Sequence, residues 1–188
     1  MPLEITAGKK VSPRVAAQSD RLFIALLPDA KVRAALAAAA AGFAGIGRLI
    51  PDENLHLTLA FLGSVPIKRG AQAARALREA HPESFDLNLD RFGYFANSGA
   101  LWVGPGASPL ALITLQRRLA MRLRSHGFKL EDRAFRPHVT LLRDCARPDA
   151  ESLSAAPAIA WRVTQAALVR SQPASGGSRY AVVDAARC

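Results

Sequence analysis

Cysteine is scarce in this sequence. Its 188 residues include two cysteines, Cys145 and Cys188, and these do not form a C-x-x-C pair. A disulfide framework and a cysteine-based zinc cluster are therefore excluded, and this usage fits the reducing cytoplasm. Long hydrophobic runs are also absent: no stretch reaches the roughly 18 consecutive apolar residues that indicate a membrane-spanning helix.

Several sequence signatures are missing as well. Residues 1–20 contain no continuous apolar stretch and do not resemble a secretory signal, so we expect a mobile N-terminal extension there. The chain carries no G-x-G-x-x-G, Walker A, G-x-S-x-G or H-E-x-x-H motif. The sequence therefore gives no sign of the dinucleotide-binding, P-loop, serine-hydrolase or zinc-protease sites that these motifs mark.

Negative charge is sparse relative to positive charge. The chain has 15 Asp and Glu residues against 25 Lys and Arg, a net charge of +10 and a pI of about 10.8. Most of the positive residues are arginines, which bind phosphate through two parallel hydrogen bonds. The charge predicts a partner that carries phosphate, such as RNA or a nucleotide, although a general role in solubility fits it equally.

The length and the 50% hydrophobic content predict one globular domain over residues 21–188. Asp29 is the expected N-cap of the first helix, and Asn97-Ser-Gly99 is a hairpin turn signal. Hydrophobic periodicity predicts helices at 30–41, 67–80 and 109–126 and strands at 21–27, 54–63, 85–92, 100–103, 135–143, 158–169 and 180–183.

One short pattern occurs twice, each time in an apolar run typical of a buried strand. The first copy is His56-Leu-Thr58-Leu59 and the second is His138-Val-Thr140-Leu141. Side chains alternate between the faces of a strand, so each histidine shares a face with its threonine. Each half of the chain offers a strand, a helix and then this pattern, which suggests two similar lobes with the motif strands facing each other across a cleft.

Two imidazoles and two hydroxyls around one groove suit the cleavage of a phosphoester without a metal or other cofactor. At neutral pH one histidine can remove a proton from the attacking oxygen while the other protonates the departing oxygen. A metal site is the alternative for paired histidines. It needs three or four ligands, and strand alternation does not place the nearest acidic residues on this face; a distant third ligand stays open.

The segments His56–Gly63 and Arg136–Arg143 resemble the paired signatures of the 2H phosphoesterases. Within that superfamily, the chain is most similar to the bacterial RNA 2′,3′-cyclic phosphodiesterases, also called 2′-5′ RNA ligases. The resemblance extends over most of the chain after Asp20 and includes Leu101–Gly104 and Leu168–Ser171. It implies an α+β fold of two pseudo-symmetric lobes, each an antiparallel sheet with outer helices, around a central cleft.

The resemblance also implies an activity and roles for the residues. The family hydrolyses the 2′,3′-cyclic phosphate at an RNA end, such as that of a tRNA fragment, to a 2′-phosphate, and can join RNA ends by the reverse reaction. His56 would protonate the leaving 3′ oxygen, His138 would activate water, and Thr58 and Thr140 would bind the phosphate. No obligate protein partner is evident. A small cyclic nucleotide or ADP-ribose cyclic phosphate as substrate, and a non-catalytic RNA-binding module, remain alternatives.

Arg143 matches a family position associated with phosphate contact. Simple alternation from His138 places it on the opposite face of the strand, so it reaches the phosphate only if the strand ends or bulges near Leu142; otherwise it is a surface arginine. Its counterpart in the first motif is Phe61, which burial tendencies predict to be a core residue. Tyr180 and Trp102 are expected to pack within hairpins, with stacking on a base as the alternative.

Overall fold

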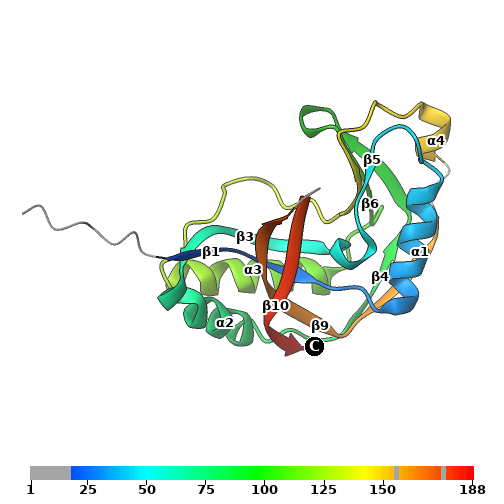
Figure 1. The fold of residues 1–188 in the computed structure, drawn as a ribbon. Coiled ribbons are helices and arrows are strands. Elements are labelled where there is room, and N and C mark those ends of the chain that lie inside the picture. Colours follow the sequence, from blue (N-terminus) through cyan, green and yellow to red (C-terminus); the bar gives the residue numbers. More distant parts are fainter. Residues whose placement is uncertain (1–17, 155–156, 175–176) are drawn as a thin grey trace, which may run out of the picture.

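The computed structural model describes residues 18–154, 157–174 and 177–188 (Figure 1). The expected extension at 1–20 lies largely outside this range, although the first strand already begins at Ser19. Four α-helices are present in the described part of the chain: α1 (Ala30–Ala41), α2 (Gly70–Glu79), α3 (Leu110–Ser125) and α4 (Ala150–Ser154). Short 3₁₀ turns cover Asp52–Asn54, Ile67–Arg69 and Ala96–Ser98.

The strands of the described residues are all paired in antiparallel fashion. One sheet has the order β10-β9-β1-β3-β7-β6-β5, with β2 also paired to β7, and a smaller sheet consists of β4 and β8. The strands are β1 (Ser19–Leu26), β2 (Arg48–Leu49), β3 (Leu57–Pro66), β4 (Phe85–Leu89), β5 (Arg91–Phe95), β6 (Ala100–Gly104), β7 (Val139–Arg143), β8 (Ile159–Val163), β9 (Gln165–Ala174) and β10 (Gly177–Arg187).

The large sheet has two halves that meet between β3 and β7. We call β1, β3, β9 and β10 with α2 and α3 the first lobe, and β2, β5, β6 and β7 with α1 and α4 the second lobe (Figure 1). The two halves are joined through the pair Leu57–Val139. The α+β fold of two antiparallel lobes is thus confirmed, but the motif strands are direct neighbours in one sheet instead of facing each other across a gap.

The core lies between the sheet and the helices. Leu22, Ile24 and Leu26 alternate along β1 into the main core, whereas Phe23 and Ala25 point to the opposite face and form a small second cluster. This alternation is the expected period of two for a strand with both faces covered. The helices contribute aligned apolar residues, such as Leu112, Leu115 and Leu119 of α3, as their 3.6-residue spacing predicts.

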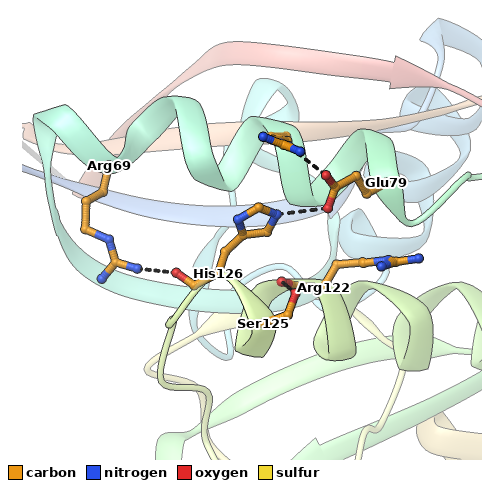
Figure 2. A network of polar contacts seen from close by, with 6 residues as sticks. Arg69, Glu79, Arg122, Ser125 and His126 are labelled. Atoms are coloured by element: carbon orange, nitrogen blue, oxygen red, sulfur yellow. Dashed lines mark hydrogen bonds and ion pairs between the residues drawn. The ribbon is translucent and has the colours of Figure 1, made fainter.

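Helices α2 and α3 are held together by polar contacts at their ends (Figure 2). The His126 ring lies 2.9 Å from a Glu79 carboxylate oxygen, and Arg75 binds the other oxygen of the same carboxylate at 2.7 Å. Arg69 donates to the His126 carbonyl at 2.6 Å, which satisfies a carbonyl at the end of α3. His126 therefore has a structural role at a helix terminus.

Several sequence predictions are confirmed. Helix α1 has the predicted bounds, and Asp29 caps it by accepting a hydrogen bond from the Val32 amide at 2.8 Å. The β5–β6 hairpin turns at Gly99, which has a left-handed φ of 54°.

Among the described residues, no helix combines the length and the apolar character that crossing a membrane requires.

Several predicted strand boundaries are wrong. The motif strands begin at Leu57 and Val139, directly after their histidines, instead of at 54 and 135, and the last strand covers Gly177–Arg187 instead of 180–183. The segments 85–92 and 158–169 each form two strands, because the chain passes between the two sheets near Asp90 and Thr164. The first motif strand continues past Gly63 to Pro66. Gly63 has a φ of 67° beside a register shift, so it allows a bulge and does not end the strand.

Candidate active site

The two motif histidines lie directly before neighbouring strands. His56 precedes β3 and His138 precedes β7, and the pair Leu57–Val139 sets the register between these strands. Continued by one residue in each direction, that register sets His56 opposite Thr140 and Thr58 opposite His138. Opposite side chains in an antiparallel pair have Cβ atoms about 4.5–5.5 Å apart. The structure thus brings all four motif residues together on one face of the sheet, which we call the motif face.

Both imidazole rings are oriented by the same local contact. His56 Nδ1 lies 2.6 Å from the Asn54 carbonyl oxygen, and His138 Nδ1 lies 2.6 Å from the Arg136 carbonyl oxygen. A carbonyl oxygen only accepts hydrogen bonds, so Nδ1 must carry the proton in each ring. In the neutral form, Nε2 is then the atom with a free lone pair. Each Nε2 is available to exchange a proton with a substrate.

Aromatic side chains surround the two rings in a matched way. Phe23 and Tyr180 lie 4.8 and 5.3 Å from His56, measured between ring centroids. Phe95 and Trp102 lie 4.9 and 5.9 Å from His138. The sequence predicts hairpin packing for Tyr180 and Trp102. It does not reveal that each ring also lies against a motif histidine, because the strands that carry the histidines are distant in the chain.

The pKa of each histidine lies below its ordinary value of 6.5. For His56, partial burial is the main cause, and the positive charges of His138 and Arg143 lower the pKa further, against the effect of the Asn54 carbonyl. For His138, burial is again the main cause, with Arg133 and Arg143 adding to it and the Arg136 carbonyl opposing it. The free site therefore favours neutral imidazoles, which suits a base more than an acid.

The strand parity of Arg143 is changed by a bulge in β7. Trp102 of β6 pairs with Thr140, whereas Leu101 pairs with Leu142, so Leu141 is an extra residue. Both Leu141 and Leu142 are buried, and Arg143 returns to the face that carries Thr140. The charge of Arg143 influences both histidines. Arg143 therefore belongs to the motif face through a bulge near Leu142, one of the two conditions under which the sequence allowed it.

The first motif carries the same irregularity. Ala25 of β1 pairs with Thr58 and Ile24 pairs with Ala60, so Leu59 is the extra residue. Phe61 consequently occupies the position that Arg143 has in the second motif. It is 46% exposed, with the Arg133 guanidinium 5.9 Å from its ring. The prediction that Phe61 is a core residue is wrong: it followed the general tendency of phenylalanine to be buried, whereas the bulge turns this side chain to the motif face.

The donor set of the site is poor in metal ligands. Among residues 18–154, 157–174 and 177–188, no group of three or more His, Cys, Asp or Glu side chains is arranged to hold a metal ion. The two histidines are accompanied by hydroxyl, guanidinium and aromatic groups instead. This set fits the binding of a phosphate anion and the movement of protons.

Comparison with known proteins agrees with this chemistry. The family model of the 2′-5′ RNA ligase superfamily matches residues 26–174. The RNA 2′,3′-cyclic phosphodiesterase of Escherichia coli is 35% identical over 71% of this chain and 76% of its own length. The RNA 2′,3′-cyclic phosphodiesterase of Thermus thermophilus is 33% identical over 87% of this chain and 88% of its own length.

Solved structures show the same fold. The crystal structure of E. coli LigT complexed with 3′-AMP has a TM-score of 0.80 at 30% identity, covering 90% of this chain and 98% of that chain. The crystal structure of E. coli LigT complexed with phosphate has a TM-score of 0.76 at 28% identity, covering 90% of this chain and 97% of that chain. The motif face described above therefore belongs to a fold whose solved examples include nucleotide and phosphate complexes.

Proposed function

This chain belongs to the 2′-5′ RNA ligase superfamily, and on that premise we propose that it hydrolyses 2′,3′-cyclic phosphates at RNA ends to 2′-phosphates. The observation that carries the proposal is the pair of imidazoles, His56 and His138. Both have Nδ1 bound to a carbonyl and share one face of the sheet with two threonines. The pair supplies two proton-transfer groups for one phosphorus centre.

The reaction uses the two Nε2 atoms in opposite senses. His138 Nε2 accepts a proton from water while the water oxygen forms a bond to phosphorus. The bond between phosphorus and the ribose 3′ oxygen breaks, and protonated His56 Nε2 donates its proton to that oxygen. The products are a 2′-phosphomonoester and a 3′-hydroxyl. The assignment of the acid role to His56 and the base role to His138 comes from the resemblance to the family. The local geometry does not distinguish the two rings, because each has the same contact from Nδ1 to a carbonyl oxygen.

The substrate's own charge adjusts the histidines for these roles. A cyclic phosphate is an anion, and an anion beside an imidazole favours its protonated form. Binding of substrate thus opposes the burial that lowers the pKa of His56 in the free site. We assign Thr58, Thr140 and Arg143 to the phosphate oxygens, because all three share the motif face with the histidines and an arginine binds two phosphate oxygens at once.

The same geometry allows the reverse reaction with a ribose 2′-hydroxyl, which would join RNA ends through a 2′-5′ linkage. The natural substrates would be RNAs with a cyclic phosphate end, tRNA fragments among them. We place this reaction in the cytoplasm, because Cys145 and Cys188 are both free thiols and free thiols are typical of a reducing compartment.

The deciding experiment is product analysis with an RNA oligonucleotide that ends in a 2′,3′-cyclic phosphate, in the presence of a chelator. We expect a 2′-phosphate product. His56→Ala and His138→Ala should each lower the rate by about 10²–10⁴-fold, the usual loss of a general acid or base. His81→Ala, which removes a histidine beyond the end of α2, is the control and should keep full activity. A 3′-phosphate product, or full activity in either motif variant, would overturn the proposal.

A further inference from the structure

A groove of about 880 Å³ lies beside the motif residues in the first lobe. This volume falls within the range of about 300–1,000 Å³ typical of ligand pockets. The lining side chains are mostly small and polar, and they come from the start of β1, the end of β3, the end of β9 and the start of β10. They include Ser19, Arg21, Ser64, Ser171 and Ser178. The reaction described above leaves this groove unused.

The groove opens on the motif face. Phe23 lies on that face, with its ring centroid 4.8 Å from that of His56. Arg21 precedes Phe23 by two residues in β1, so its side chain points the same way and lies about 6–7 Å farther along the strand. Its ladder partners are Ser64 of β3 and Ser171 of β9. The groove is therefore a continuation of the surface that carries His56, Thr58 and Phe61.

Charge in the groove favours an anionic chain. Arg21 is exposed and forms no ion pair with any residue in the described part of the chain. Asp20 also lines the groove, but strand alternation turns its side chain to the other face of β1, where its carboxylate lies 3.5 Å from the Arg170 guanidinium and is balanced by it. The groove thus presents one free guanidinium among hydroxyl groups, a combination that binds phosphate and sugar oxygens.

The rim of the groove is tied to the motif. Asn54 donates its side-chain amide to the Ser178 carbonyl at 2.8 Å, and the Asn54 carbonyl holds the His56 ring. The floor is open at Gly63, where an added Cβ would meet no heavy atom within 4 Å. A chain lying here is therefore continuous with a phosphate held at the histidines.

We propose that this groove binds the nucleotides on the 5′ side of the cyclic phosphate and that Arg21 contacts a phosphate of that RNA backbone. The inference rests on the proposed function and adds to it a preference for oligonucleotides over mononucleotides. A mononucleotide ends before Arg21, whereas an RNA chain continues past Phe61 into the groove.

The test compares a 2′,3′-cyclic mononucleotide with oligonucleotides of two, three and five nucleotides that end in the same cyclic nucleotide. For the native protein, kcat/KM should rise with length and then level off. Arg21→Ala should lower kcat/KM on the three- and five-nucleotide substrates by about tenfold, the loss expected for one charged hydrogen bond, and leave the mononucleotide unchanged. Arg21→Lys should recover part of the loss.

Two further variants separate the groove from general effects of charge and folding. Arg117→Ala removes the same charge from an exposed position on α3 and should behave as native. Ser171→Tyr fills the groove without a change of charge and should also reduce turnover of the longer substrates alone. The salt dependence of oligonucleotide binding should be weaker by about 0.7 in its logarithmic slope for Arg21→Ala.

The outcomes are distinct. The native protein could turn over substrates of all lengths equally, or oligonucleotide turnover could be unchanged in both Arg21→Ala and Ser171→Tyr. Either result would overturn the proposal that the groove binds RNA and would leave the proposed cyclic phosphodiesterase activity standing. Equal losses on the mononucleotide and the oligonucleotides would also count against it, because they would indicate damage at the histidines. If the native protein turned over none of the substrates, the proposed function itself would fail.

Discussion

Leu57 and Val139 form the ladder pair through which β3 joins β7, and this pair places His56 across from Thr140 and Thr58 across from His138. Two segments 82 residues apart, the difference between positions 138 and 56, thereby contribute to one candidate site. Both leucine and valine at these positions are fully buried, so the register is stabilised by the core beneath the site.

Arg143 should influence the pH dependence of the reaction. Burial is the main reason why the pKa of both histidines lies below 6.5, and the charge of Arg143 lowers both pKa values further, so kcat/KM of the native protein should peak below about pH 6.5 in a bell-shaped profile. Arg143→Ala removes that charge, so both pKa values rise and both limbs of the profile move to higher pH. The activity maximum should fall at the same time, because a phosphate contact is lost. A lower maximum with unmoved limbs would show that Arg143 acts on the phosphate alone.

The threonine hydroxyls should matter for catalysis and little for folding. Thr140→Val and Thr58→Val retain the shape and β-branching of the side chain but remove its hydrogen-bonding group. Each should reduce kcat/KM about 10–100-fold, as expected for a lost contact to a charged group. The melting temperature should change little, since neither hydroxyl is a buried group left without a partner in the described structure. If both variants kept the kcat/KM of the native protein, the proposed role of the threonines in binding the phosphate would be wrong.

Gly93 should be required for the position of Trp102. The two residues are ladder partners, and a methyl group at Gly93 would overlap the Trp102 indole. Gly93→Ala should destabilise the protein by about 1–3 kcal/mol, the usual cost of overpacking. Because Trp102 contacts His138, activity should fall as well. Gly70→Ala, where an added Cβ meets nothing within 4 Å, is the matched control and should be neutral in denaturant unfolding and in turnover.

Glu79 should make the folding stability of the protein depend on pH in the acidic range. Hydrogen bonds from His126 and then Arg75 lower the pKa of its carboxyl group to about 2 (Figure 2). The ionised Glu79 carboxylate therefore stabilises the folded protein fully at pH values above its ordinary pKa of about 4.5, and this stabilisation is lost as the pH falls toward 2. Glu79→Gln should lower the melting temperature at pH 7 and show a smaller further loss below pH 4.5 than the native protein. Turnover of cyclic phosphate at 25 °C should be unaffected, since the α2–α3 contact is remote from the motif face.

The sequence by itself determined which residues are candidates for the site, and it predicted most of the helices and strands. The repeated His-x-Thr pattern identified His56, Thr58, His138 and Thr140, because residue type and a period of two are local properties that need no knowledge of the partner strands. The Asp29 cap and the bounds of α1 were also predictable, since capping depends on neighbouring residues.

Only the tertiary structure decided how these parts meet. The bulges at Leu59 and Leu141 exist through pairing with β1 and β6, and they bring Phe61 and Arg143 to the motif face against simple alternation. The division of segments 85–92 and 158–169 between two sheets has the same origin. Strand register and sheet membership are properties of partners distant in the chain, so the residues of one strand do not specify them.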